Sequence, residues 1–127
     1  MSSALTQGIL VTVVSQYIPE RSSVSSHQFA FAYTVRIANQ GDEPAQLKSR
    51  HWIITDANGN VQEVRGEGVV GEQPLLHPGQ HFEYTSWCVI ATSSGSMRGT
   101  YHMVRPGGDA FDAEIAPFRL GLPQTLN

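Results

Sequence analysis

The chain has 127 residues, of which 40% are hydrophobic and 15% are charged, which is the size and composition of one folded domain. Its formal net charge of -3 argues against general binding to nucleic acid or to acidic membranes, because both attract basic proteins. The single cysteine, Cys88, excludes a disulfide within the chain. No secretory signal pattern or membrane-length apolar stretch is present, so we expect a cytoplasmic protein.

Alternation of apolar and polar residues dominates the chain and predicts β-strands. Within residues 27–39, every second side chain from Phe29 to Ile37 is aromatic or β-branched, a pattern that a pleated strand aligns on one face. Six other segments have strand character, and turn-forming residues separate them. In chain order, the predicted strands are residues 9–18, 27–39, 47–55, 61–65, 80–90, 96–104 and 110–118.

No segment shows the spacing of an amphipathic helix, so the fold class predicted is all-β. About seven short strands separated by turns indicate an antiparallel β-sandwich of the immunoglobulin or fibronectin type III kind, with a closed barrel as the alternative. We expect a single domain over residues 1–127, with frayed ends at residues 1–6 and 121–127. The open edges of such a sandwich leave a homodimer as one option.

Residues 66–71 read Gly-Glu-Gly-Val-Val-Gly and fit the string G-x-G-x-x-G. In dinucleotide-binding folds such glycines let backbone amides approach a pyrophosphate at the start of a helix. Here two prolines stand where that helix would follow, which favours a structural glycine-rich loop. The alternative is an anion site in which the backbone of Gly66, Gly68 and Gly71 holds a pyrophosphate-containing molecule, with Arg65 as counter-charge.

Five histidines raise the question of a metal site. His77 and His81 have the spacing of a helical zinc pair, but a Pro-Gly pair between them excludes the helix. Glu83 falls on the same strand face as His81, so these three residues are the candidate ligands for a divalent cation. The other three histidines are isolated in predicted strands, where a histidine is more often a surface residue than a ligand.

The sequence offers no catalytic arrangement. It lacks a G-x-S-x-G nucleophile elbow, and its serine pairs lie in turn-like segments. Cys88 lies within a strand, and nothing near it in sequence would activate the thiol. We therefore expect a non-enzymatic domain with no catalytic residues and no cofactor.

Trp52 and Trp87 should both fill or flank the core, as a tryptophan commonly does in immunoglobulin-like sandwiches. The alternative for either is an exposed binding anchor. Trp87 lies on the opposite face of its predicted strand from Phe82 and Tyr84. It shares the more polar face with His81. Its position predicts partial exposure and hints at an interaction surface.

Several long segments of the chain resemble the ApaG family, whose stand-alone bacterial members are also called CorD. The resemblance extends over essentially the whole chain. The segments that carry it are residues 50–59, 64–74, 76–86, 94–103 and 111–120. It implies a fibronectin type III-like sandwich, and the glycine signature of the family is matched by Gly66, Gly68 and Gly71.

What the resemblance implies for function is less specific. Bacterial members are associated with cobalt resistance and magnesium efflux, and their genes commonly lie near the gene for a diadenosine tetraphosphate hydrolase. Related eukaryotic domains look like protein-interaction modules. We expect a non-enzymatic module that binds an unknown protein partner or a small ligand. The alternatives are a pyrophosphate or dinucleoside-polyphosphate sensor and a divalent-metal binder.

Overall fold

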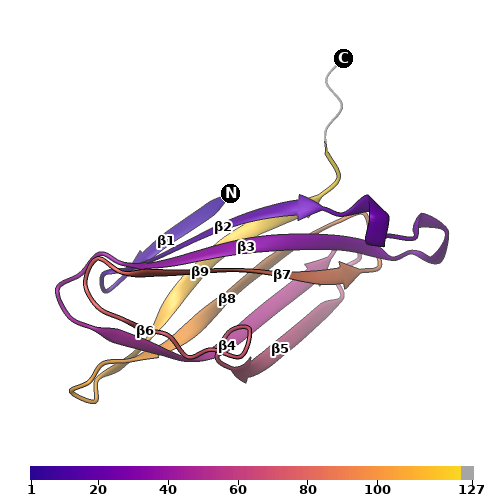
Figure 1. Ribbon diagram of the computed structural model, residues 1–127. Coiled ribbons are helices and arrows are strands. Elements are labelled where there is room, and N and C mark those ends of the chain that lie inside the picture. The colour runs from indigo at the N-terminus through magenta and orange to yellow at the C-terminus, as the bar shows by residue number, and fades with distance from the viewer. Residues whose placement is uncertain (124–127) are drawn as a thin grey trace.

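The computed structural model describes residues 1–123 and shows two antiparallel β-sheets packed face to face (Figure 1). Single turns of 3-10 helix, η1 (Pro19–Arg21) and η2 (Val24–Ser26), lie between the second and third strands. The strands are β1 Ser2–Thr6, β2 Ile9–Tyr17, β3 Phe29–Asn39, β4 Ala45–Asp56, β5 Val61–Glu67, β6 Leu75–Leu76, β7 His81–Ile90, β8 Ser94–Val104 and β9 Ala110–Gly121.

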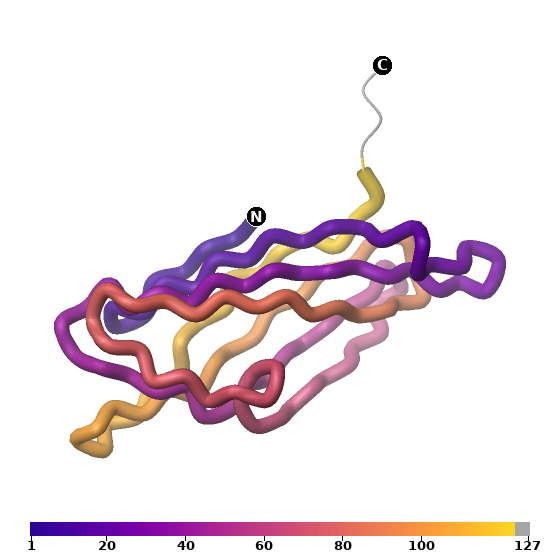
Figure 2. Tube along the Cα trace, in the orientation of Figure 1, coloured from indigo at the N-terminus to yellow at the C-terminus, as the bar shows by residue number. Residues whose placement is uncertain are grey.

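The strand order confirms the predicted sandwich. One sheet has the order β1-β2-β3-β7, the other has the order β5-β4-β8-β9, and β6 pairs with β4. Figure 2 shows the two sheets as separate layers that cross each other, so the alternative of a closed barrel is wrong. All seven predicted strands are present, with ends that differ by a few residues. In residues 1–123 no helix has the length and hydropathy needed to cross a membrane.

The prediction of a frayed N-terminus over residues 1–6 is wrong. Ser2–Thr6 forms β1, which turns back at Gln7 and Gly8 and pairs with β2 in a register that joins Thr6 to Ile9. β1 also packs on β9, where the amide of Glu114 donates to Thr6 Oγ1 at 3.0 Å. The strand was missed because its short, polar sequence has no hydrophobic alternation. At the other end β9 extends to Gly121, and residues 124–127 lie outside the described residues.

The core lies between the sheets and follows the alternation of the strands. Phe31, Val35 and Ile37 of β3 are fully buried, as the pattern of residues 27–39 predicts. Trp52 is 2% exposed and meets the rings of Tyr101 and Phe118 edge-on, which confirms its place in the core. Aromatic pairs of this geometry contribute beyond the area they bury.

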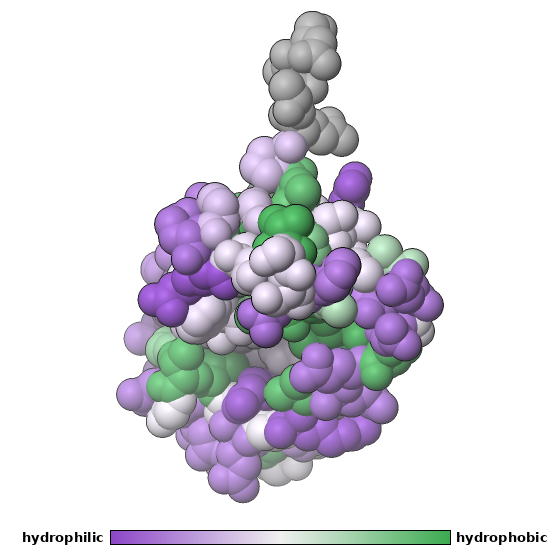
Figure 3. All heavy atoms as spheres, turned by 90° about the vertical axis from the view of Figure 1, so that its right-hand side faces the viewer, coloured by the Kyte–Doolittle hydropathy of each residue, from purple (hydrophilic) through white to green (hydrophobic). Residues whose placement is uncertain are grey.

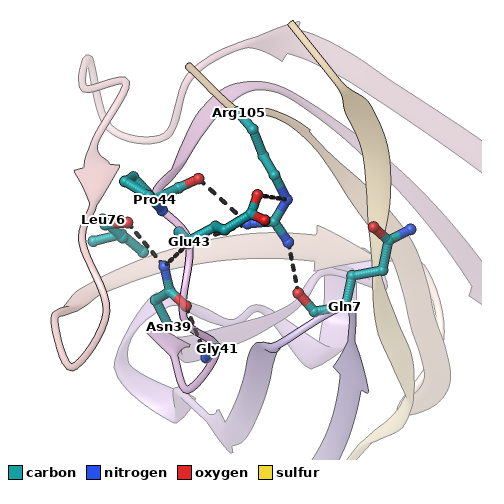
Figure 4. A network of polar contacts seen from close by, with 7 residues as sticks. All are labelled: Gln7, Asn39, Gly41, Glu43, Pro44, Leu76 and Arg105. Carbon is teal, nitrogen blue, oxygen red and sulfur yellow. Dashed lines mark hydrogen bonds and ion pairs between the residues drawn. The ribbon is translucent and has the colours of Figure 1, made fainter. Parts of the chain in front are cut away.

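A polar network closes one end of the sandwich (Figure 4). Asn39 is 2% exposed, and its side-chain amide donates to the carbonyl oxygens of Glu43 and Leu76 and accepts from the amide of Gly41. Arg105 donates to the carbonyl oxygens of Gln7, Glu43 and Pro44. These hydrogen bonds connect three loops. Both polar atoms of the buried Asn39 side chain, Nδ2 and Oδ1, have hydrogen-bond partners.

The two long sides of the sandwich differ. On one side, β1 and β2 pack against β9 and close the gap between the sheets. On the other side, β7 and β5 are the last strands of their sheets, and no comparable contact joins them. The sandwich is therefore open between β5 and β7.

Candidate binding site

The open side of the sandwich contains a cleft of about 240 Å³, which we call the edge cleft. Residues of β3, β4, β5 and β7 form its walls. They are Tyr33, Arg50, Trp52, Ile54, Gln62, Val64, Trp87, Cys88 and Val89. A smaller hollow of about 190 Å³ shares Ile54, Gln62 and Val89 with the cleft and continues toward the start of β5. The two together follow β7 and β5 along the open side.

The edge cleft has an apolar base and an exposed apolar rim. Tyr33 and Trp52 at the base are buried, with ring centroids 5.2 Å apart. At the rim, Trp87 is 50% and Val89 is 47% exposed, which confirms the predicted exposure of Trp87. Seen from the end where β7 finishes and β5 begins, hydrophobic side chains lie at the surface between hydrophilic regions (Figure 3). An exposed tryptophan beside an apolar cleft is a feature of binding surfaces.

Among residues 1–123, Arg50 is the one charged side chain that lines the edge cleft. It lies on the inward face of β4, opposite Gly66 of β5 and Tyr101 of β8. Its Nη1 donates to the carbonyl oxygens of Glu67 at 3.0 Å and of Gly68 at 2.9 Å. Within residues 1–123 it forms no ion pair with a carboxylate. The cleft therefore carries a positive charge without a matching acid.

Each glycine of the predicted anion loop has a structural reason to be glycine. A Cβ on Gly66 would lie 2.7 Å from the guanidinium atoms of Arg50, so glycine leaves room for this side chain. Gly68 has a φ of +63°, and a Cβ there would collide with the carbonyl oxygen of Glu72. Gly71 has a φ of +81°, which favours glycine. These three positions are explained by the fold without a ligand.

The chain after β5 curls into a tight loop whose amides are used internally (Figure 2). The amide of Gly68 donates to the carbonyl oxygen of Lys48, and Val69 and Glu72 each donate to the carbonyl oxygen of the other. Val70 at the tip has a φ of 45°, which is uncommon for a β-branched residue. An anion would have to compete with protein acceptors for several of the amides that a phosphate-binding loop needs.

A second concavity, the outer hollow, lies on the outward face of the β5-β4-β8-β9 sheet and measures about 590 Å³. Arg50, which also lines the edge cleft, borders this hollow, and so do two histidines that each pair with a carboxylate. His51 Nε2 lies 2.7 Å from Glu63 Oε1, and His102 Nδ1 lies 3.0 Å from Asp112 Oδ1. Arg65 borders the hollow, is largely exposed, and approaches Glu63 at 3.6 Å. Arginine and carboxylate side chains therefore both border this hollow.

His51 and His102, which were expected to be isolated, share the outer hollow because of strand register. His51 pairs with Arg65 of β5 and with Thr100 of β8, two residues from His102. The β-bulge at Leu47 and Ser49 in β4 shifts the pairing beside them. Neither the register nor the bulge can be predicted from the sequence alone, so the sequence contains no pattern that indicates the proximity of His51 and His102.

The proposed metal ligands do not form a three-residue cluster. His77 precedes the turn that leads into β7, and its backbone amide donates to Gln80 Oε1. His81 and Glu83 are exposed on β7, opposite Ala38 and Arg36 of β3. Among residues 1–123, no three His, Cys, Asp or Glu side chains gather as metal ligands would. Any cation at His81 and Glu83 would rely on water for its other ligands.

Cys88 has the environment of a structural thiol. Burial raises its pKa to about 11, and its Sγ lies 3.8 Å from the sulfur of Met97. Nearby, burial raises the pKa of Tyr33, Tyr84 and Tyr101, and the hydroxyls of Tyr84 and Tyr101 contact each other. These groups stay protonated at neutral pH, so the cleft presents the Cys88 thiol and the Tyr33 phenol in their uncharged forms.

The two sheets, their strand order and the open cleft define an all-β sandwich domain of the immunoglobulin and fibronectin type III kind. A family model described as the ApaG domain matches residues 19–105. The chain belongs to the ApaG family, which confirms the resemblance found in its motifs.

Individual relatives match the chain over nearly its full length. Protein ApaG of Anaeromyxobacter sp. (strain K) is 66% identical over 127 residues, which cover 100% of both chains. Protein ApaG of Pseudomonas aeruginosa (strain LESB58) is 59% identical and covers 92% of this chain and 93% of its own. A crystal structure described as the ApaA protein from Bordetella pertussis has a TM-score of 0.89 and 57% identity, covering 92% of this chain and 95% of its own.

Proposed function

We propose that this chain is a non-enzymatic cytoplasmic module that binds a protein partner at the edge cleft. The observation that carries the proposal is the half-exposed Trp87 beside an open cleft with an apolar base, on a strand that is paired along one edge only. A rigid sandwich holds such a surface in place without a conformational change. Tryptophan is enriched among residues that dominate binding energy, and truncating one at an interface often costs 2 kcal/mol or more.

A peptide library displayed on phage and selected on the intact chain tests this function. Binders recovered with the wild-type chain should lose at least about tenfold in affinity for Trp87→Ala, which removes the anchor at the rim. They should bind Arg65→Ala as tightly as the wild-type chain, because Arg65 borders the outer hollow and not the cleft. Binders that depend on Arg65 and ignore Trp87 would contradict the proposal.

The pyrophosphate or dinucleoside-polyphosphate sensor stays a prediction, and the exposure of Arg65 beside the outer hollow is the observation in its favour. An amide NMR titration with pyrophosphate and then with a diadenosine polyphosphate tests it. Saturable shifts at residues 65–71 that disappear in Arg65→Ala would establish the sensor. Unchanged spectra up to millimolar ligand would leave the glycines with the structural roles described above.

The divalent-metal binder also stays a prediction, as does any role in cobalt resistance or magnesium efflux. Cobalt added to the same NMR sample should broaden signals around His77, His81 and Glu83 if these residues bind it. Because the structure brings only His81 and Glu83 to one strand, we expect weak binding that His81→Ala abolishes. Broadening spread over all five histidines would instead indicate unspecific association.

A further inference from the structure

Residues 85–90, in the second half of β7, lack the features with which edge strands avoid pairing, although Glu83 lies earlier in the same strand. β7 is the last strand of its sheet, so alternate backbone N–H and C=O groups along it have no strand partner. Edge strands are commonly protected by charged side chains or proline. Residues 85–90 of β7 read Thr-Ser-Trp-Cys-Val-Ile and contain neither. The facing edge strand, β5, carries Glu63, Arg65 and Glu67.

Charge in the edge cleft is positive although the whole chain has a net charge of -3. Arg50 supplies one positive group, and Arg21 of η1 supplies a second at the rim, with its Cζ 4.4 Å from the centre of the Trp87 ring. No acidic side chain from the residues that the structure describes, 1–123, lines the cleft. Nη1 of Arg50 binds two carbonyl oxygens, and in the described part of the chain its Nε and Nη2 donate to no protein acceptor. Two such N–H groups side by side match the two oxygens of a carboxylate.

We propose that the partner supplies an extended acidic segment, which adds to the free edge of β7 as an extra strand. This inference rests on the proposed function and names the chemistry of the partner. Side chains alternate between the faces of a strand. One face of the added strand would place a carboxylate in the cleft toward Arg50. The other face would place apolar side chains beside Trp87 and Val89.

The size and charge of the cleft favour this occupant over a second copy of the chain. A volume of about 240 Å³ holds one or two side chains, while the backbone of the segment lies along the edge. Two copies paired through β7 would bring Arg21 and Arg50 of each copy toward the same residues of the other. Like charges facing each other across an interface oppose association, whereas an acidic segment is attracted.

Isothermal titration calorimetry with a defined peptide tests the inference on the intact chain. The probe is acetyl-Thr-Val-Thr-Val-Glu-Val-Thr-amide, in which the valines share one face and the glutamate lies on the other. Its matched control has glutamine in place of glutamate. We expect the glutamate peptide to bind at least about tenfold more tightly, because a hydrogen bond to a charged group in a partly buried site exceeds a neutral one by about 1.4 kcal/mol.

Protein variants assign the effect to Arg50. Arg50→Gln should bind both peptides with the affinity that the wild-type chain has for the glutamine peptide, and Arg50→Lys should recover part of the preference. The preference of the wild-type chain is measured by changing the peptide alone, so the test stands even if Arg50→Gln does not fold. Strand addition is tested separately with two peptides N-methylated on opposite sets of alternate amides. One set should abolish binding and the other should not, because only one edge of the peptide faces β7.

The outcomes separate this inference from the proposed function. Binding that depends on the glutamate, on Arg50 and on one set of amides supports it. Two results would overturn the inference and leave the proposed function in place, provided that Trp87→Ala still weakens binding. The first is equal affinity for the glutamate and glutamine peptides. The second is binding of both N-methylated peptides. No binding at millimolar peptide overturns it as well. Sedimentation equilibrium of the chain alone tests whether a second copy of the chain occupies the edge of β7. A dimer that dissociates in the Trp87→Glu variant would identify the second copy as the occupant and overturn the inference.

Discussion

Replacing Gly66 with alanine should destabilise the fold through Arg50. The new Cβ would lie 2.7 Å from the guanidinium, so Arg50 has to move away. The move breaks its hydrogen bonds to the carbonyl oxygens of Glu67 and Gly68. Because the site is partly exposed, we take about 1 kcal/mol for each bond, which is below the range for charged hydrogen bonds, and so about 2 kcal/mol for the pair. Alanine at an ordinary strand φ returns about 0.5 kcal/mol, so the net loss is about 1.5 kcal/mol.

A double-mutant cycle isolates this contact. In an Arg50→Ala background no guanidinium stands in the way, so Gly66→Ala should raise the free energy of unfolding by about 0.5 kcal/mol. The coupling energy between the two positions is then about 2 kcal/mol. Urea denaturation of the wild type, the two single variants and the double variant measures it. Additivity within about 0.5 kcal/mol would refute the reasoning and would return Gly66 to the candidates for a ligand-binding role.

Four further predictions test the structure elsewhere. Val70→Asn should raise the free energy of unfolding by about 1 kcal/mol in urea, because asparagine tolerates the φ of 45° better than valine, and a loss of stability would contradict the turn geometry. Cys88 should react with iodoacetamide at pH 8 about 100-fold more slowly than a thiol of ordinary pKa, since its pKa of about 11 leaves less thiolate. The same raised pKa stabilises the fold fully below about pH 9, and this contribution falls away as the pH rises through 11, so Cys88→Ala should flatten the loss of stability in that window. Asn39→Leu should lower the free energy of unfolding by about 3 kcal/mol in urea, because the buried carbonyl oxygen of Leu76 and the amide of Gly41 lose their side-chain partner, whereas the carbonyl oxygen of Glu43 keeps Arg105; a neutral effect would show that water replaces the side chain.

Hydrophobic alternation was sufficient to predict the sandwich and its seven main strands, because each long strand buries one face. It could not reveal β1 or β6. Ser2–Thr6 is short and polar, and Leu75–Leu76 is only a two-residue pairing with β4. These strands form because of the partners beside them, which is tertiary information that local sequence does not contain.

The candidate site could be predicted only in part. The phase of β7 predicted the exposure of Trp87, since alternate residues must face away from the core. The role of Arg50 was missed, because a charged residue in phase with Trp52 gives no sign of the open edge beside it. The glycine pattern at residues 66–71 suggested an anion site, whereas in the structure Gly66 leaves room for the side chain of Arg50 on the neighbouring strand. That relation depends on the register that pairs Arg50 with Gly66.

Backbone amide hydrogen exchange tests the central claim most directly, namely that binding occurs on the open side of the sandwich. The intact chain would be compared with and without a peptide recovered from the library. Binding along β7 should slow exchange at least about tenfold at alternate amides of residues 85–90, since an added strand covers the amides that point away from β3. Protection confined to residues 65–71 or to the strands under the outer hollow would contradict the account.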